Sequence, residues 1–442
     1  MNLLQIADRV IELVGDRAEA QVTVDGTEHN LTRFANSFIH QNVGERGLEV
    51  TLKLAVNDRV ASATSTRSDE TGLVSLVEET IHAARLRPTD KDWPGLAAAA
   101  EPAAPARFEP ATTAATPDTR AAQVAAFIAA GDGLLGAGYF DTQGGVTAFA
   151  NSAGQRLVAE TSRATLDGIH QTGTSAGSAH ATSADLGDIN GERLGMDAAA
   201  KARDAAATRD LDPGAYEVIL SPECVATMMF FFGAYGWNAK AHLEGQSFVE
   251  LGAQQFDPAV TIEDDYADPL AVGLPFDADG TPKRKVSMVD AGVSSSLAHD
   301  RRTAKQAATS STGHAVPGGD AFGAFPSNLH FRSGPDPVPD MIAAVERGLF
   351  ITTFNYCRIL DPRTQVVTGL TRNGTFLIER GEISGAVSNL RFTQSFVEAL
   401  SPGRILGIGD DARMADTEVG PGIASAPSVR LASWNFTGGS QG

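Results

Sequence analysis

The chain has 442 residues, a hydrophobic content of 42% and a formal net charge of −19 at pH 7. Its length predicts two domains, and its negative charge argues against a nucleic acid or an anionic membrane as partner, because both bind basic surfaces. No stretch approaches the ~20 consecutive apolar residues of a membrane span. The two cysteines, Cys224 and Cys357, are far apart in sequence, which excludes a disulfide framework and predicts a cytoplasmic protein.

The first part of the chain predicts a helix followed by an antiparallel sheet. Apolar residues recur at helical spacing over 3–14, and after Gly15 the period changes to two. The predicted strands are 20–24, 30–34, 38–41 and 48–54. Gly, Asn and Asp residues between them are typical of turns.

Helices are next predicted over 71–86 and 119–135, on either side of a segment rich in Pro and Ala. We expect that segment, 87–118, to be an extended and loosely packed connection within the first domain. The short strands predicted after it are 139–140, 146–150, 156–160 and 162–169. After an Ala-rich helix, Asp212-Pro-Gly214 predicts a boundary between domains of residues 1–212 and 213–442.

Three histidines of the first domain carry side chains that could bind a metal or transfer protons. His40, in the tract Asn36-Ser-Phe-Ile-His-Gln-Asn42, is interpreted as a structural strand residue or part of a substrate groove, with a ligand or base as the alternative. His170 and His180 lie beside or within a polar tract, so we expect both to be exposed. A metal role would require the fold to bring a carboxylate or another imidazole close.

The second domain begins with a predicted strand, 216–220, and a helix that starts at a Ser-Pro pair. The tract from Cys224 to Ser247 resembles the TldD/PmbA family of two-subunit metallopeptidases. In that family the same helix carries a His-Glu-x-x-x-His metal motif, followed by Gly-x-Ser. Gly245-Gln-Ser247 matches this trailer, and counting back from it places the three motif positions on Phe230, Phe231 and Tyr235.

These aromatic side chains supply neither the donors that zinc needs nor a general base. The pattern therefore resembles the non-catalytic subunit type, TldE or PmbA. The three rings either fill a core or line a cleft for apolar peptide side chains. The family's last ligand is a cysteine near the C-terminus, but residues 405–427 contain neither Cys nor His. In that region Asp410, Asp411 and Asp416 could coordinate only weakly.

The remaining tracts extend the resemblance, which covers most of residues 30–56 and 214–400. Asp277 and Asp279 lie in an acidic turn that we expect to be solvated, and His314 is interpreted as a loop residue. Alternating strands are predicted at 350–358, 368–372, 374–381 and 389–392. The predicted fold is α+β, with an antiparallel sheet in an N-terminal α/β domain and a large, curved, mostly antiparallel sheet in the C-terminal domain.

The resemblance implies a catalytically silent subunit of a heterodimeric zinc metallopeptidase that cleaves unfolded or ribosomally made, modified peptides. A TldD-like partner would supply the zinc, and this chain would carry no metal. One alternative is a homo-oligomeric scaffold that binds peptides without a peptidase partner. Another is an independent hydrolase that uses Cys357, with Arg358 lowering its thiol pKa; a buried, inert cysteine is the plainer interpretation.

Overall fold

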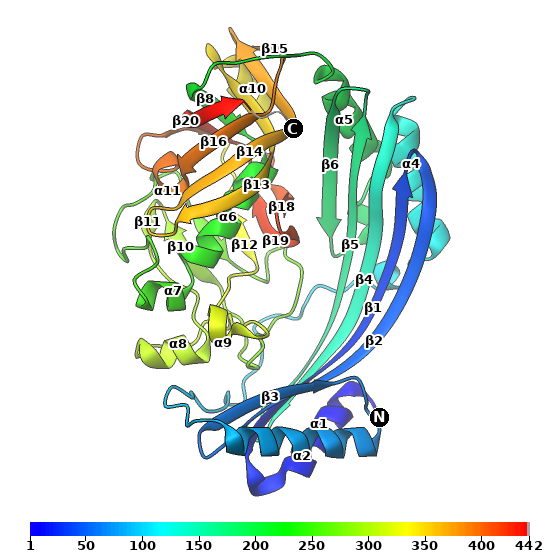
Figure 1. Ribbon diagram of the computed structural model, residues 1–442, viewed down its shortest axis with the longest axis vertical. Helices are drawn as coiled ribbons and strands as arrows, with labels where there is room; N and C mark the ends of the chain where they lie inside the picture. Colours follow the sequence, from blue (N-terminus) through cyan, green and yellow to red (C-terminus); the bar gives the residue numbers. More distant parts are fainter. Residues whose placement is uncertain (440–442) are drawn as a thin grey trace.

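The structure is a computed structural model that describes residues 1–439. Long curved strands form one side of the molecule, and the C-terminal half lies on the other side (Figure 1). The predicted α+β fold is confirmed. No helix within residues 1–439 is both long and apolar enough to span a bilayer.

The N-terminal sheet is fully antiparallel, in the order β3-β2-β1-β4-β5-β6. Its strands are β1 (Glu19–Ala35), β2 (Phe38–Val56), β3 (Arg59–Ser65), β4 (Leu135–Asn151), β5 (Arg156–Gln171) and β6 (Ala176–Ser183). The short strands predicted from the sequence are joined into these longer ones. Glycines that resemble turn residues in the sequence lie inside these strands. Gly26 of β1 and Gly145 of β4, for example, belong to adjacent residue pairs of the β1–β4 register. Gly26 has no Cβ to press on Leu3 of the covering helix, and a Cβ there would lie only 3.0 Å from that side chain.

The helices of the N-terminal half cover one face of this sheet. They are α1 (Leu3–Val14), α2 (Glu70–Leu86), α3 (Pro110–Thr113), α4 (Pro117–Ala130) and α5 (Gly191–Asp204). The predicted first helix begins with a capping box in which Asn2 and Gln5 satisfy each other's backbone amides. Its apolar stripe packs with α2 against Val22 and Val24, while α4 and α5 cover the opposite end of the same face.

The Pro- and Ala-rich segment crosses between the two halves without regular structure up to α3. It is more firmly packed than expected, because Trp93 and Ala97 are buried. The Trp93 indole donates a hydrogen bond to Glu19 at 2.7 Å, and Arg301 donates to the Leu96 carbonyl at 2.6 Å. The segment therefore contacts both halves of the chain.

The C-terminal half shares its strands between two sheets. One has the order β11 (Val293–Ser294), β10 (Val286–Asp290), β9 (Ile262–Asp264), β12 (Leu329–Phe331), β19 (Gly420–Ala426) and β18 (Arg413–Thr417). The other has the order β13 (Arg347–Asp361), β8 (Gly214–Leu220), β20 (Val429–Gly439), β16 (Leu390–Ser395), β14 (Val366–Glu379), β15 (Glu382–Val387) and β7 (Thr208–Arg209), with β17 (Ile405–Ile408) beside β20. Most pairings are antiparallel; β12–β19, β13–β8 and β15–β7 are parallel.

Helix α6 (Pro222–Tyr235) lies between these two sheets and contacts β13 on one side and β18–β19 on the other. It is apolar around most of its circumference, which is typical of a helix surrounded by protein. The other helices are short: α7 (Ala239–Leu243), α8 (Arg301–Gln306), α9 (Gly319–Phe322), α10 (Val338–Ala343) and α11 (Phe396–Ala399). The main C-terminal core surrounds α6.

Candidate functional site: a polar cavity between the two halves

The uncovered face of the N-terminal sheet is polar. On β1, Val22 and Val24 point to the helices and are fully buried, whereas Thr23 and Asp25 point to the other face. The same alternation continues on the neighbouring strands β2, β4 and β5. The sheet therefore presents hydroxyl, amide and carboxylate groups to the C-terminal half.

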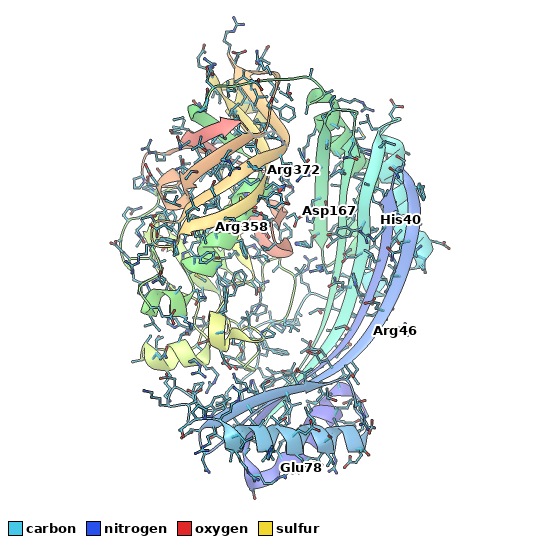
Figure 2. All side chains as sticks on the ribbon, in the orientation of Figure 1. His40, Arg46, Glu78, Asp167, Arg358 and Arg372 are labelled. Carbon is cyan, nitrogen blue, oxygen red and sulfur yellow. The ribbon has the colours of Figure 1, made fainter. Side chains whose placement is uncertain are left out.

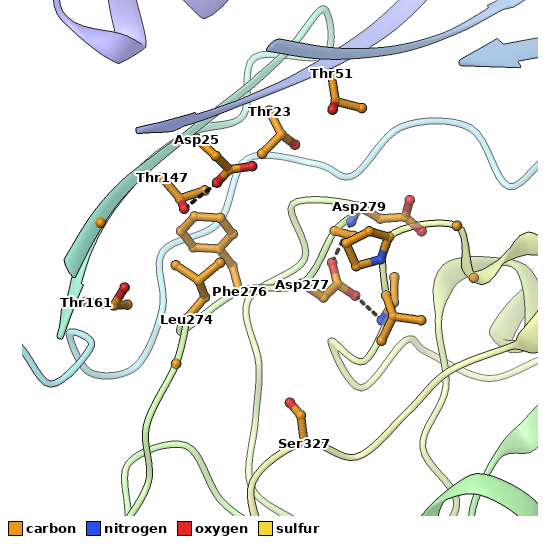
Figure 3. A pocket seen from close by; sticks show the side chains of 18 of the residues that line it. Thr23, Asp25, Thr51, Thr147, Thr161, Leu274, Phe276, Asp277, Asp279 and Ser327 are labelled. Atoms are coloured by element: carbon orange, nitrogen blue, oxygen red, sulfur yellow. Dashed lines mark hydrogen bonds between the residues drawn. The ribbon is translucent and has the colours of Figure 1, made fainter. Parts of the chain in front are cut away.

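Loops of the C-terminal half close this face into a cavity of about 870 Å³. The two walls come from residues 272–279 and 314–320 on one side and from strands β1 to β5 on the other. Figure 3 shows Thr23, Asp25, Thr51, Thr147 and Thr161 on the strand side and Leu274, Phe276, Asp277, Asp279 and Ser327 on the loop side. Thr147 donates to Asp25 at 2.6 Å, and Phe276 packs beside Phe149 under this pair. A cavity of this size has room for several residues of an extended peptide.

Direct contacts hold the walls together. Gln21 of β1 donates to the Ala278 carbonyl at 3.2 Å, and Lys53 of β2 pairs with Asp279 at 3.8 Å and with Asp320 at 3.2 Å. These contacts cross from one half of the chain to the other. The loop wall is thereby fixed relative to the sheet.

His314 belongs to a buried charged network in the loop wall. Its Nε2 lies 2.9 Å from Asp264 Oδ1, and its Nδ1 lies 2.8 Å from the Thr312 hydroxyl. Burial opposes ionisation of Asp264, but His314 and Lys283 together hold the pKa of that carboxyl below its ordinary value. His314 is in a loop, as expected, and it is also fully buried at the edge of the cavity.

The acidic turn is not solvated, which corrects the expectation from sequence. The Asp277 side chain is buried and accepts backbone hydrogen bonds from Asp279, Thr281 and Ala315. Burial and the neighbouring Asp279 charge raise the pKa of Asp277 to about 7. Alternating polarity could not reveal this burial, because the cover comes from the other half of the chain.

The three motif positions lie at the C-terminal end of α6. Phe231 is 5% exposed and contacts Phe396 at a ring distance of 5.8 Å. Phe230 and Tyr235 are half-buried; Phe230 packs on Phe325, which lines the cavity, at 5.9 Å. In the described part of the chain, residues 1–439, none of these three side chains lines the cavity. None of them carries a nitrogen, sulfur or carboxylate group that could bind a metal.

Residues 213–438 match the sequence model of the PmbA/TldA metallopeptidase C-terminal domain. The chain belongs to this TldD/PmbA family. A metalloprotease from Methanothermobacter thermautotrophicus is 26% identical over 227 residues, a match that spans 48% of this chain and 47% of that protein. The alignment thus covers about half the length of this curated relative.

Two solved structures resemble the whole fold. TldE from Thermococcus kodakarensis has a TM-score of 0.86 at 17% identity, with 99% of both chains covered. A protein from Thermotoga maritima, described as a proposed modulator of a DNA gyrase, has a TM-score of 0.85 at 18% identity, with 98% of this chain and 99% of that chain covered. At these identities the likeness shows the fold.

Two other candidates from the sequence lie away from the cavity of this TldD/PmbA-family chain. His40 is exposed near the start of β2, next to Phe38 (Figure 2). Cys357 is buried, and burial together with Glu418 raises the pKa of its thiol. The Arg358 side chain, 68% exposed and paired with Glu418 at 3.6 Å, does not offset this. The structure gives no support to a nucleophilic thiolate at Cys357.

His170 and His180 are buried, not exposed as the polar tract suggested. The polar tract includes β6, an ordinary strand of the sheet. His170 stacks on Phe127 and contacts the Phe127 carbonyl at 3.0 Å, which is a structural role. His180 lies beside Asp167 of β5 and Asp416 of β18.

Asp167 was not among the residues predicted from the sequence. A carboxylate between Leu166 and Gly168 in an alternating strand is the available signal, since acidic residues are depleted in strands. Asp416 was predicted only as a weak metal ligand, together with Asp410 and Asp411 in residues 405–427. Asp167 lies opposite His180 in the β5–β6 register, whereas Asp416 comes close to both through the docking of the two halves.

Proposed function

We propose that this chain is a non-catalytic, TldE-type subunit of a heterodimeric metallopeptidase, in which a TldD-like partner supplies the zinc and the catalytic base. The observation that carries this proposal is the combination of a polar cavity between the two halves with aromatic rings at the metal-motif positions. Phe231 is packed into the core, and Phe cannot bind zinc or accept a proton. Family membership supports peptidase chemistry for the assembly.

We further propose that the cavity holds an unfolded or modified peptide in extended form. Strand β3 is an edge of the N-terminal sheet, and its Ser62 and Thr64 line the cavity. Backbone groups on a free edge can pair with an added strand, while the threonines of the sheet face offer further hydrogen bonds. The buried, unpaired thiols support a reducing compartment, the cytoplasm, for this assembly.

Purified chain, purified TldD-like partner and the co-expressed pair are compared for cleavage of a flexible test peptide. The proposal expects no cleavage by this chain alone and chelator-sensitive cleavage by the pair. Peptidase activity of the chain alone would overturn it. Peptide binding by the chain with no gain in cleavage on mixing would overturn it in favour of the peptide-binding scaffold.

A second arm tests the cavity. Thr64→Trp places a large ring at the exposed edge of the cavity, and Val158→Trp places the same ring at an exposed strand position outside it. We expect Thr64→Trp to raise the KM of the pair several-fold with a smaller effect on kcat, and Val158→Trp to leave both unchanged. Equal effects of the two substitutions would contradict peptide binding in the cavity.

A further inference from the structure

A cluster of three metal-ligating side chains lies outside the cavity, where β5 and β6 of the N-terminal sheet meet β18. Asp167 and His180 are direct partners in the β5–β6 register, and Asp416 comes from β18. One donor atom from each residue lies within 4.8 Å of the other two. Figure 2 shows Asp167 between the curved sheet and the C-terminal half. The cluster therefore joins the two halves of the chain.

The imidazole of His180 is oriented for a ligand on one side. Its Nε2 lies 3.0 Å from the Thr182 hydroxyl, which itself contacts the Thr165 hydroxyl at 3.0 Å. Its Nδ1 has no hydrogen-bond partner within residues 1–439 and points toward Asp416, 3.9 Å from Oδ2. The residue is only 7% exposed. Metal-binding histidines show this arrangement, in which a hydrogen bond at one nitrogen fixes the ring and leaves the other for the ion.

The carboxylates around His180 also lack compensation. Asp416 Oδ1 is buried and has no hydrogen-bond partner in the described part of the chain. Burial raises the pKa of Asp167 to about 6, and burial with the charges of Asp167 and Glu223 raises that of Asp416 to about 7. Burial lowers the pKa of His180 to about 4, so its ring is neutral, the form that binds metals. A divalent cation would balance the two carboxylates.

The nearby basic groups are engaged elsewhere. Arg413 pairs with Glu223 at 2.6 Å, and the Lys201 ammonium donates to the Ser178 carbonyl at 2.9 Å. Arg163 points toward Asp141, 3.9 Å away. These cations thus have other partners and do not neutralise the Asp167–Asp416 pair.

We propose that Asp167, His180 and Asp416 bind one divalent transition-metal ion that ties the N-terminal sheet to β18. One imidazole and two carboxylates suit Zn²⁺ best and Mn²⁺ second, because Zn²⁺ accepts nitrogen and oxygen together while Mn²⁺ favours oxygen. Bonds of about 2.0–2.2 Å require donors about 3–4 Å apart. Small side-chain rotations would bring the present donors to that spacing. Asp416 is 28% exposed on its side chain, which leaves an entry path and room for water as a further ligand.

This site is distinct from the family motif positions on α6 and does not depend on the proposed function. Its expected effect is on the fold. Because the three ligands come from both halves, an ion that binds only the folded chain stabilises their docking in proportion to its concentration.

The test uses the full chain, stripped with a chelator and titrated with Zn²⁺ and, separately, Mn²⁺. The wild-type chain is expected to bind one ion and to show a raised thermal midpoint. His180→Gln and Asp416→Asn should each lower the affinity at least about tenfold. His40→Gln and Asp410→Asn, an exposed histidine and an exposed carboxylate, should bind like wild type.

Asp416→Asn also distinguishes a bound metal ion from a proton shared between the Asp167 and Asp416 carboxyl groups. Removing one of two repelling carboxylates should leave the metal-free variant at least as stable as the wild type, while the rise in midpoint on adding metal is lost. A wild-type chain that binds neither ion saturably, or binding that survives both His180→Gln and Asp416→Asn, would overturn the proposal. A midpoint that rises in Asp416→Asn without any metal effect in the wild type would overturn it as well.

Discussion

His314 Nε2 lies 2.9 Å from Asp264 Oδ1, and both side chains are almost fully removed from solvent. The second Asp264 oxygen accepts the Asn328 amide at 2.8 Å, and Lys283 is fixed nearby by the Asn328 side chain at 2.8 Å. The loop wall of the cavity is therefore built on a buried charged network. Such networks are costly to disrupt because the remaining partner stays buried.

Replacing His314 tests this network. In His314→Gln the Asp264 carboxylate loses its nearest partner, and we expect the free energy of unfolding to fall by about 3–5 kcal/mol. Urea denaturation at pH 7 measures the change. His40→Gln, at an exposed position, should change stability by no more than about 0.5 kcal/mol. Equal effects of both substitutions would show that the buried pair contributes little.

The acidic turn gives the protein a pH dependence of defined sign. The folded-state pKa of Asp277 is raised to about 7 by burial and by Asp279, above its unfolded value of about 3.9. Between these values the folded chain holds a proton that the unfolded chain releases. Stability is therefore favoured at low pH and lost as the pH rises from about 4 to about 7, with a slope of at most about 1.4 kcal/mol per pH unit from this group.

Asp279→Asn should weaken that dependence, because it removes the charge that raises the pKa of Asp277. The measurement is the difference in urea midpoint between pH 5 and pH 7.5, compared with the wild type. Asp320→Asn is the matched control: Asp320 also pairs with Lys53 but does not raise the pKa of Asp277. If the urea midpoint of Asp279→Asn changed between pH 5 and pH 7.5 as much as that of the wild type, the Asp279 charge would not be a cause of the raised pKa of Asp277.

Features that depend on residues close together in the sequence were predicted correctly. The first helix, α1, has its own cap and apolar stripe, so its limits follow from spacing alone. Strand lengths did not follow, because Gly26 and Gly145 read as turns but lie inside curved strands whose neighbours are remote in sequence. The burial of His180 was missed for a related reason: Asp416 and the strand that carries it come from the other half of the chain.

The positions on α6 illustrate the opposite case. A fixed spacing to Ser247 was enough to locate Phe230, Phe231 and Tyr235, because a motif on one helix is local. That spacing could not distinguish a core from a cleft, since burial depends on Phe325 and Phe396 from distant segments.

Neither cysteine should react in the folded protein. Burial raises the pKa of both Cys224 and Cys357, so the thiolate that alkylating reagents attack is scarce and enclosed. We expect no modification by iodoacetamide at pH 8 under native conditions and two modified sites per chain after denaturation, as counted by mass spectrometry. Tyr356→Cys, at a side chain that is 64% exposed, should react in the native state. Rapid native alkylation of Cys357 would revive the thiol-hydrolase alternative.

The aromatic motif positions should differ from one another in their contribution to stability. Phe231 is 5% exposed and packs against Phe396 and Tyr235, so Phe231→Ala should cost about 3–5 kcal/mol. Phe230→Ala removes a half-buried ring and should cost clearly less. Urea unfolding of both variants measures this difference. A larger loss from Phe230→Ala, or a rise in the KM of the pair with unchanged stability, would indicate instead that these rings contact the peptide.

A glutamate at the central motif position, Phe231, should not give the chain peptidase activity, because aromatic side chains surround this position. Phe231→Glu would place a carboxylate among Phe230, Phe396 and Tyr235, and these rings offer no cation or metal to compensate it. We expect a loss of stability larger than that of Phe231→Ala and no gain of peptidase activity by the chain alone. Phe231→Gln, equally long but uncharged, separates the cost of the charge from the cost of shape. A Phe231→Glu chain as stable as Phe231→Gln would show that solvent or an ion reaches this position, and that the helix end is open rather than core.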